Sequence, residues 1–212
     1  GTIGDFGCFS FYATKNLSTG EGGMVLSKSL KSSLKIKTLS LHGISKDAWK
    51  RFSSDGYKHY KVTDAGYKYN MMDIQAALGI EQLKRINKNW KKRKKIWNIY
   101  HDELKNTKLQ LLPKKSLGNK LSYHLFPVLV KKASGITRNQ LVDYLTKARI
   151  GCGVHYEAIP SHPYYFKSFS WNPKKYPNAV SFGKQTLSLP ISPAIDNNQI
   201  DYIINNVKKL VK

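Results

Sequence analysis

The residues best suited to chemistry are concentrated between residues 9 and 23. Lys15 stands in the middle of this stretch, between hydroxyl side chains and ahead of a Gly-Glu-Gly-Gly run. A lysine amine can form a Schiff base with an aldehyde when it is held in place and its charged form is disfavoured. The hydroxyls of Ser10, Ser18 and Thr19 can donate hydrogen bonds to a phosphate. The stretch therefore combines a potential nucleophile with potential phosphate ligands.

Residue type alone does not single out Lys15. Lysine and arginine together number 36, and 31 of these are lysines. The remaining basic residues are Arg51, Arg85, Arg93, Arg138 and Arg149. A lysine taken at random from this chain is a solvated surface charge, so the argument for Lys15 depends on the residues around it.

Two strands and a glycine-rich turn are expected to position Lys15. The apolar and aromatic segment 9–11 is typical of a strand end, and strand-like character resumes at 24–26. Glycine permits the tight backbone turn that must lie between them. The glycines are Gly20, Gly22 and Gly23. The sequence therefore predicts a constrained loop that carries Lys15 between two strands.

The order of these residues resembles a known cofactor-binding segment. Aromatic-Ser-aromatic-Tyr, two small residues, Lys and then Gly-Glu-Gly-Gly is similar to the cofactor-lysine segment of the DegT family of nucleotide-sugar aminotransferases, which use pyridoxal 5'-phosphate. The resemblance implies that Lys15 carries this cofactor and is the catalytic residue. It also implies that Ser10 binds the cofactor phosphate.

A second block surrounds Asn70, just ahead of a long helical pattern. Asn70 and the free N–H groups of a helix start could both face an anion, or Asn70 could simply cap the helix. The segments 65–70 and 73–77 are similar to the second strongest block of the DegT family. The resemblance implies that Asn70 reaches the cofactor phosphate of a partner subunit. A homodimer with shared active sites is therefore expected.

Four further residues are candidates for contact with substrate. His42 matches a histidine of the family, although Ser40 replaces the basic residue that many members carry two positions earlier. His155 lies in a block that the family places near the sugar nucleotide, but a strand histidine is often purely structural. Tyr12 and Tyr67 are lid or substrate candidates, and packing is the alternative role. No spacing of histidine or cysteine indicates a metal site.

Bulk properties favour a soluble, cytoplasmic protein. The chain has 212 residues, 41% of them hydrophobic, which is enough for one large domain or two small ones. No apolar run is long enough to span a bilayer. Cys8 and Cys152 are too few for a disulfide framework, so a reducing cytoplasm is expected. The first residue, Gly1, suggests removal of an N-terminal part or a fragment.

The charge leaves a competing hypothesis open. A net charge of +23 and a pI near 9.9 would suit a basic nucleic-acid or polyanion-binding module on a degenerate, non-catalytic aminotransferase fold. The excess is spread along the chain, however, which equally fits a compositional bias toward lysine. The run Lys91–Lys95 could bind phosphates or form a solvated helix face. Binding to a nucleic acid is therefore a less favoured hypothesis than aminotransferase activity. A regulatory member of the family without activity is likewise less favoured.

Elements of the first part follow from hydrophobic periodicity. Residues 28–41 predict a short helix and a strand-like exit, and residues 44–60 predict a long irregular segment. A long amphipathic helix is expected from Asp73 onward. Its apolar positions are Ile74, Leu78, Leu83, Ile86, Trp90, Trp97, Tyr100 and Leu104.

The second part predicts a small α+β domain. The expected elements are a strand at 123–130, a helix at 137–148 with Thr137 as N-cap, a strand at 154–156, proline-rich loops at 159–165 and 171–177, a short apolar segment at 186–191 and a helix at 197–211.

The fold class implied by the resemblance is α/β, of the aspartate-aminotransferase type (PLP fold type I). Residues 1–110 would be the remaining part of the PLP-binding large domain, with a mostly parallel sheet and the long linking helix. Residues 111–212 would be the small C-terminal domain. The resemblance covers the second half of the family's chain. The N-terminal phosphate-binding turn, stacking aromatic residue and ring-pairing aspartate are therefore expected to be missing.

The resemblance also implies the reaction. It is transamination of a nucleotide-linked keto sugar to an amino sugar, with glutamate as donor, in the biosynthesis of surface polysaccharide or a related glycan. Lys15 would act as general base and acid. Because half of the site is expected to be absent, these 212 residues alone are expected to bind the cofactor poorly.

Overall fold

The structure is a computed structural model that describes residues 1–44, 59–114 and 119–211. The chain divides into two compact units, Gly1–Ile86 and Asn87–Lys212. The irregular segment predicted for residues 44–60 lies almost entirely outside the described residues. Each unit is therefore described by itself.

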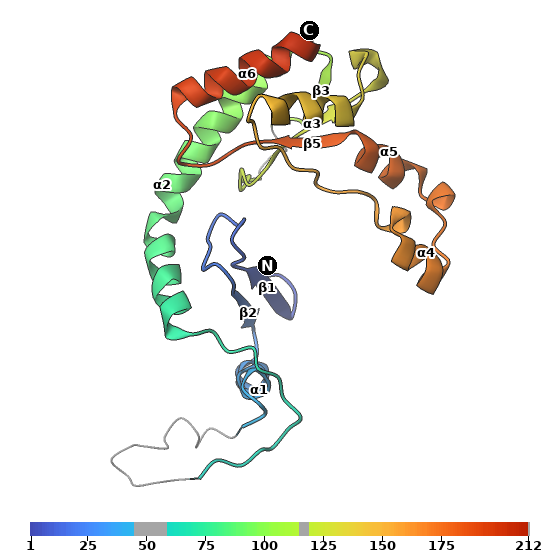
Figure 1. Cartoon of the computed structure of the whole chain (residues 1–212). Helices are drawn as coiled ribbons and strands as arrows, with labels where there is room; N and C mark the ends of the chain where they lie inside the picture. The colour runs from blue at the N-terminus through green and yellow to red at the C-terminus, as the bar shows by residue number, and fades with distance from the viewer. Residues whose placement is uncertain (45–58, 115–118, 212) are drawn as a thin grey trace. The chain divides into compact units, whose positions relative to one another are not determined.

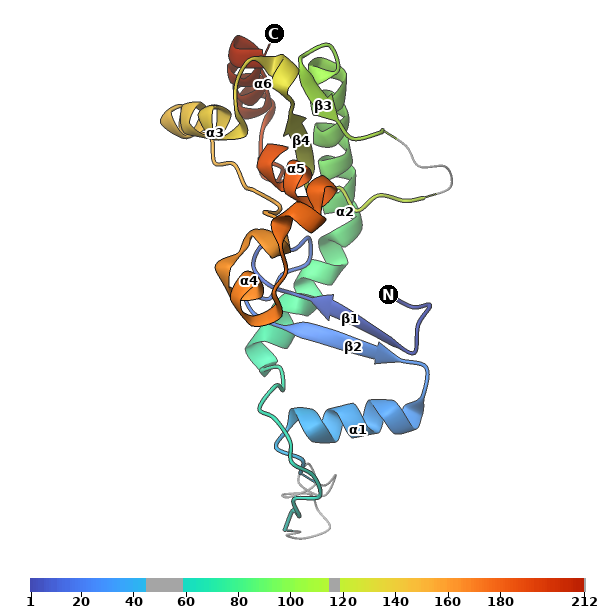
Figure 2. The same ribbon diagram turned by 90° about the vertical axis from the view of Figure 1, so that its right-hand side faces the viewer.

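The first unit contains a pair of antiparallel strands. Strand β1 (Phe6–Ser10) pairs with β2 (Gly23–Ser27), with Phe6 opposite Ser27 and Ser10 opposite Gly23 (Figure 1). Helix α1 (Leu30–Ser40) follows β2 (Figure 2). The Ser29 hydroxyl accepts a hydrogen bond from the Ser32 amide at 3.3 Å and so caps the helix. The strands and the helix expected here are confirmed.

The long helix expected from the apolar periodicity is confirmed as α2 (Asp73–Leu104). Its C-terminal half contributes Ile96, Trp97 and Leu104 to the core of the second unit. The second compact unit therefore begins within α2, after Ile86, because this half of the helix packs with the residues that follow it. The boundary between a large and a small domain, expected near residue 110, stays a prediction.

The second unit is built on a three-stranded sheet. Strands β3 (Leu109–Leu111), β4 (Phe126–Val130) and β5 (Thr186–Leu189) lie in the order β3-β4-β5, and both pairs are antiparallel. The strand pairs of both units are thus antiparallel. The mostly parallel sheet expected of the large domain is not formed by the described strands.

Helices α3 (Arg138–Lys147) and α6 (Asn197–Val211) confirm two further expectations. Thr137 caps α3 through a capping box: its hydroxyl accepts from the Gln140 amide at 3.2 Å, and the Gln140 side chain accepts from the Thr137 amide at 2.7 Å. Two orphan N–H groups are satisfied in this way, which fixes the helix start. Apolar side chains of α2, α3 and α6 pack with the sheet in one core.

The strand predicted at 154–156 is wrong. Only Gly153 bridges to Ser188 of β5, and residues 154–156 belong to no strand. After Gly153 the backbone no longer pairs with the sheet. Strand pairing depends on a partner distant in sequence, which periodicity does not reveal.

The proline-rich loops predicted at 159–165 and 171–177 are also corrected, because short helices lie in them or begin in them. These are η3 (Ile159–Ser161), α4 (Pro163–Phe169), η4 (Pro173–Lys175) and α5 (Pro177–Gln185). Each has a proline at its first or second position. The missing N–H of proline costs nothing there, since the first N–H groups of a helix have no intrahelical partner.

Two polar side chains of α2 fasten the chain that leaves β5. The Tyr100 hydroxyl donates to the Pro190 carbonyl at 2.9 Å, and the Arg93 guanidinium donates to the Ile191 carbonyl at 2.9 Å. Burial raises the pKa of Tyr100 and lowers the pKa of Arg93.

Among the described residues, no helix is both long and apolar enough to cross a membrane.

The thiol of Cys152 gives a chemical test of this core. Burial raises its pKa to about 11, so at pH 8 its reactive thiolate should be scarce. Iodoacetamide should modify Cys152 in the native protein on the order of a hundredfold more slowly than in the protein unfolded in urea. Peptide mass spectrometry over a time course measures both rates, with Cys152→Ser as the control for assignment. Equal native and unfolded rates would contradict the packing around Cys152.

Candidate functional site

Lys15 lies on a loop that is closed at its neck by backbone hydrogen bonds. The Phe11 amide donates to the Gly22 carbonyl at 2.8 Å, and the Thr19 amide donates to the Phe11 carbonyl at 2.9 Å. Within the loop, the Lys15 amide donates to the Tyr12 carbonyl at 2.9 Å. The Lys15 side chain is half-buried. The structure thus shows the constrained loop between two strands that the sequence predicted.

Glycine is required where this loop turns back to β2. Gly22 has a φ of 150° and Gly20 a φ of 81°, values that side chains disfavour. A Cβ atom at Gly22 would lie 2.4 Å from the Thr19 hydroxyl oxygen. That hydroxyl is buried and donates to the Glu21 carbonyl at 2.6 Å. The glycines and Thr19 therefore shape the loop.

The three candidate phosphate ligands consequently differ. Thr19 is occupied inside the loop, so its hydroxyl has a structural role. Ser10 is exposed at the end of β1, where its oxygen accepts from the Tyr12 amide at 3.3 Å. Ser18 accepts from the Gly20 amide at 3.1 Å. The hydroxyl hydrogens of Ser10 and Ser18 can still be donated to an anion.

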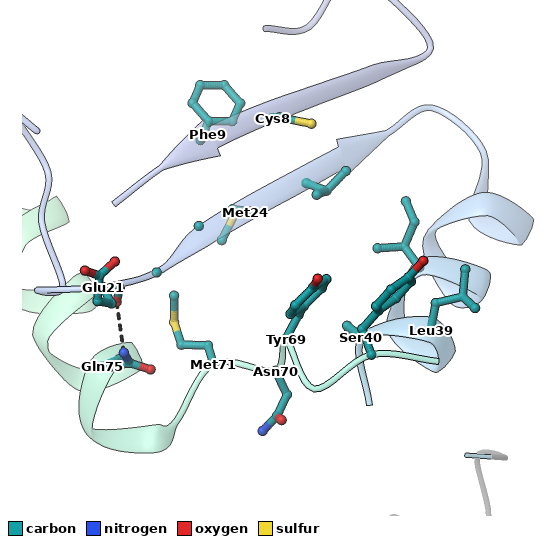
Figure 3. Close-up of a pocket in the computed structure, with 15 residues that line it drawn as sticks. Cys8, Phe9, Glu21, Met24, Leu39, Ser40, Tyr69, Asn70, Met71 and Gln75 are labelled. Carbon is teal, nitrogen blue, oxygen red and sulfur yellow. Dashed lines mark hydrogen bonds between the residues drawn. The ribbon is translucent and has the colours of Figure 1, made fainter. Parts of the chain in front are cut away.

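A cavity of about 830 Å³ lies between β1, β2, α1 and the segment that leads into α2 (Figure 3). Asn70 and Tyr67 line it, whereas Ser10, Tyr12 and Lys15 do not. The Gln75 side chain donates to the Glu21 carbonyl at 2.9 Å, as the dashed line in Figure 3 shows. This bond ties the start of α2 to the Lys15 loop.

Asn70 does not cap α2 in this structure. Its side-chain oxygen is buried and has no hydrogen-bond partner among the described residues. The Met72 amide, at the start of α2, donates instead to the side-chain oxygen of Gln75 at 3.0 Å. In Figure 3 the Asn70 amide points away from β1 and β2. Of the two roles left open for Asn70, the capping contact is thus absent, and the anion-binding role stays a prediction.

His42 and Tyr67 are joined through the backbone. His42 has a φ of 56°, and its amide donates to the Tyr67 carbonyl at 2.8 Å. The Tyr67 ring stacks on Tyr69 with centroids 5.0 Å apart, and both rings are exposed. Tyr12 is exposed as well. Exposed side chains at His42, Tyr67 and Tyr12 are compatible with substrate contact.

An ion pair connects α1 to the chain just ahead of Tyr67 and Asn70. Lys35 of α1 is hydrogen-bonded to the carboxylate of Asp64. This bond lowers the pKa of Asp64. The pair therefore links α1 to the chain just ahead of the Tyr67–Asn70 segment.

His155 belongs to the second unit. Its Nδ1 atom lies 2.9 Å from the Ser188 hydroxyl oxygen of β5, and its side chain is partly buried. In the described part of the chain, no group of three or more histidine, cysteine or acidic side chains could hold a metal ion.

Sequence reasoning gave no role to Gln75 or Ser188, although Gln75 lies in the block 73–77 that carries the family resemblance. Gln75 contacts the Lys15 loop, 54 residues away, and Ser188 contacts His155, 33 residues away. Such contacts join distant positions, so a single sequence carries no signal for them.

Comparison with known proteins agrees with this architecture. Spr1654 from Streptococcus pneumoniae, in its PMP form, matches with a TM-score of 0.87 and 32% identity over 99% of this chain and 52% of that chain. PseC of Helicobacter pylori, an aminotransferase involved in the biosynthesis of pseudoaminic acid, matches with a TM-score of 0.86 and 28% identity over 98% of this chain and 53% of PseC. The expected aspartate-aminotransferase-type α/β fold is confirmed.

The family follows from the sequence comparison. The profile of the DegT/DnrJ/EryC1/StrS aminotransferase family matches residues 1–208. SpsC, a spore coat polysaccharide biosynthesis protein of Bacillus subtilis, is 42% identical over the whole chain, which covers 55% of SpsC. The chain belongs to this aminotransferase family, whose enzymes use pyridoxal 5'-phosphate. It spans about half the length of the curated relatives it matches.

The geometry of the Lys15 loop predicts the effect of Gly22→Ala. The added Cβ would meet the Thr19 hydroxyl oxygen at 2.4 Å, at a φ of 150°. We expect the free energy of unfolding to fall by about 1–3 kcal/mol and the loop to shift. Urea denaturation measures the loss. Gly151→Ala is the matched control, because a Cβ there meets nothing within 4 Å. Equal stability of the two variants would contradict the loop geometry.

Proposed function

We propose that the protein is a pyridoxal-phosphate-dependent aminotransferase that converts a nucleotide-linked keto sugar into an amino sugar, with glutamate as amino donor. The observation that carries the proposal is the closed, glycine-dependent loop that presents the half-buried Lys15. Family membership supports the reaction class. The relatives SpsC and PseC support a place in the biosynthesis of surface polysaccharide or a related glycan.

The residues present fit the cofactor chemically. Lys15 offers an amine for the cofactor aldehyde, and Ser10 offers an exposed hydroxyl for its phosphate. Asn70 offers a side-chain amide whose N–H groups can donate to a phosphate oxygen. Its buried oxygen, which has no partner among the described residues, is an acceptor and does not bond to the phosphate oxygens. When bound, the cofactor supplies a carbonyl for amine exchange and an electron-withdrawing ring that stabilises negative charge at the donor's α-carbon.

Lys15 would move protons in both halves of the reaction. In the first half its amine would take the proton from the α-carbon of glutamate and pass it to the cofactor. In the second half it would take a proton back from the cofactor and deliver it to the sugar carbon that becomes the amine-bearing carbon. Both roles require a short, repeatable distance between the amine and the reacting carbon, which a loop closed at its neck favours.

The proposal concerns the whole protein, since the chain spans about half the length of its relatives. We propose a homodimer in which Asn70 of one subunit binds the cofactor phosphate in the other. Tyr12, Tyr67, His42 and His155 are proposed to contact the substrate. The phosphate-binding turn, stacking aromatic residue and ring-pairing aspartate would come from segments outside these 212 residues.

We also propose a cytoplasmic location, because Cys8 and Cys152 are both free thiols.

Binding of a nucleic acid or another polyanion is the second candidate function. Two contacts favour it: the ammonium groups of Lys94 and Lys120 lie 5.3 and 4.7 Å from the centre of the Trp90 ring. This basic and aromatic surface suits an anion, but it offers no group for covalent chemistry.

The first test of the proposal is Lys15→Ala in the full-length protein. Without the amine, the visible absorbance of the lysine-bound cofactor should disappear and transamination should fall by at least about 10³-fold. Lys31→Ala removes an exposed lysine of α1 and should leave both unchanged. Absorption spectra and assays with glutamate and keto-sugar nucleotides provide the measurements. Retained absorbance in Lys15→Ala would refute the assignment.

Mixing two inactive variants tests the shared active site. If Asn70 acts across the dimer, Lys15→Ala and Asn70→Ala subunits together rebuild one intact site in each mixed dimer. After co-refolding, activity should return to about one quarter of wild type, because half of the dimers are mixed and half of their sites are intact. If Asn70 acts on its own subunit's cofactor, every site carries a defect and the mixture stays inactive.

A further inference from the structure

The ring of His155 is held by a buried hydroxyl of the central sheet. Ser188 is only 3% exposed in β5, and its oxygen lies 2.9 Å from His155 Nδ1. The other ring nitrogen, Nε2, makes no hydrogen bond with the residues that the structure describes, in contrast to Nδ1. The ring therefore has one nitrogen fastened to the sheet and one that can contact a ligand.

The position of Gly153 makes room for this ring. Gly153 and Ser188 exchange two backbone hydrogen bonds, of 3.1 and 2.7 Å. This pairing places the α-carbon of Gly153 beside the imidazole. A Cβ atom at Gly153 would lie 2.4 Å from His155 Cε1 and 3.1 Å from its Nε2. A side chain at Gly153 would therefore displace the ring from Ser188.

The hydrogen-bond requirements of Ser188 select one tautomer of His155. A buried hydroxyl needs an acceptor for its hydrogen, and an unmet donor costs about 1–3 kcal/mol. Among the described residues, the one acceptor recorded for this hydroxyl is His155 Nδ1. If Nδ1 carried the proton of the neutral ring, the Ser188 hydrogen would be left without that acceptor. The bond is satisfied when Ser188 donates to Nδ1, which places the ring proton on Nε2.

We infer that Ser188 and Gly153 are positioning residues that fix His155 as a neutral hydrogen-bond donor, with Nε2–H directed to an oxygen of the sugar-nucleotide substrate. The substrate contact rests on the proposed function, whereas the tautomer does not. In this state Nε2 cannot accept a proton from the substrate. His155 thus contributes binding and orientation, and the proton transfers are left to Lys15.

Ser188→Ala in the full-length protein tests the inference. Ring nitrogen shifts in ¹⁵N-labelled protein without substrate report the tautomer. We expect wild type to show a protonated Nε2 and a bare Nδ1, and Ser188→Ala to lose this preference. For transamination, the KM for the sugar nucleotide should rise on the order of tenfold while kcat changes less than about twofold, since a binding contact is weakened. Gly153→Ala should reproduce both effects with the hydroxyl still present.

Thr186→Val is the matched control, because it removes a buried hydroxyl from the same strand while keeping the shape of the side chain. The Thr186 hydroxyl contacts the His155 carbonyl at 3.4 Å and not the ring, so the tautomer and KM should stay as in wild type. A protonated Nδ1 in wild type, or an unchanged tautomer in Ser188→Ala, would overturn the positioning role. A changed tautomer with unchanged KM would overturn the substrate contact. If the protein transaminates no sugar at all, the proposed function fails, while the tautomer measurement still decides the role of Ser188.

Discussion

Burial of strand β5 is the constraint on which the second unit depends. Every residue from Thr186 to Leu189 is buried, so each polar group of the strand must find a partner within the protein. Pairing with β4 satisfies one edge, and the bridge to Gly153 satisfies part of the other. The Ser188 hydroxyl is satisfied by His155. The requirement that stabilises the core therefore also orients a candidate substrate residue.

The structure of the first unit depends on local interactions more than on a buried core. Helix α1 has no buried residue, and large apolar side chains of β1 and β2 such as Phe6 and Met24 are more than half exposed. A two-stranded ribbon of this kind is at best marginally stable by itself. Its shape is set by short-range features: the neck of the Lys15 loop, the positive φ of Gly22 and the Ser29 cap. This unit positions Lys15 through local geometry more than through a core.

This difference explains which features could be predicted from sequence. The Lys15 loop, the Thr137 cap and the length of α2 depend on residues close in the chain, and all were predicted. The strand expected at 154–156 was wrong, because pairing with β5 ends at Gly153 and distant partners decide where a strand ends. The short helices at Pro163 and Pro177 were missed, since a proline in a first helical turn looks in sequence like a proline in a loop.

Contacts within the candidate site were also only partly predictable from sequence, and Asn70 is an example. Sequence placed it ahead of α2 but could not decide between capping and ligand binding. In the structure the Gln75 side chain, and not Asn70, makes the hydrogen bond at the start of α2. Its oxygen accepts from the Met72 amide, and its amide group donates to the Glu21 carbonyl beside the Lys15 loop. The Asn70 oxygen is left buried without a partner among the described residues, a cost of about 1–3 kcal/mol for a polar group. That oxygen is an acceptor, as a phosphate oxygen is, so the proposed phosphate contact can use only the N–H groups of the Asn70 amide. The unmet oxygen therefore calls for a hydrogen-bond donor in addition to the phosphate, and none of the described residues supplies it.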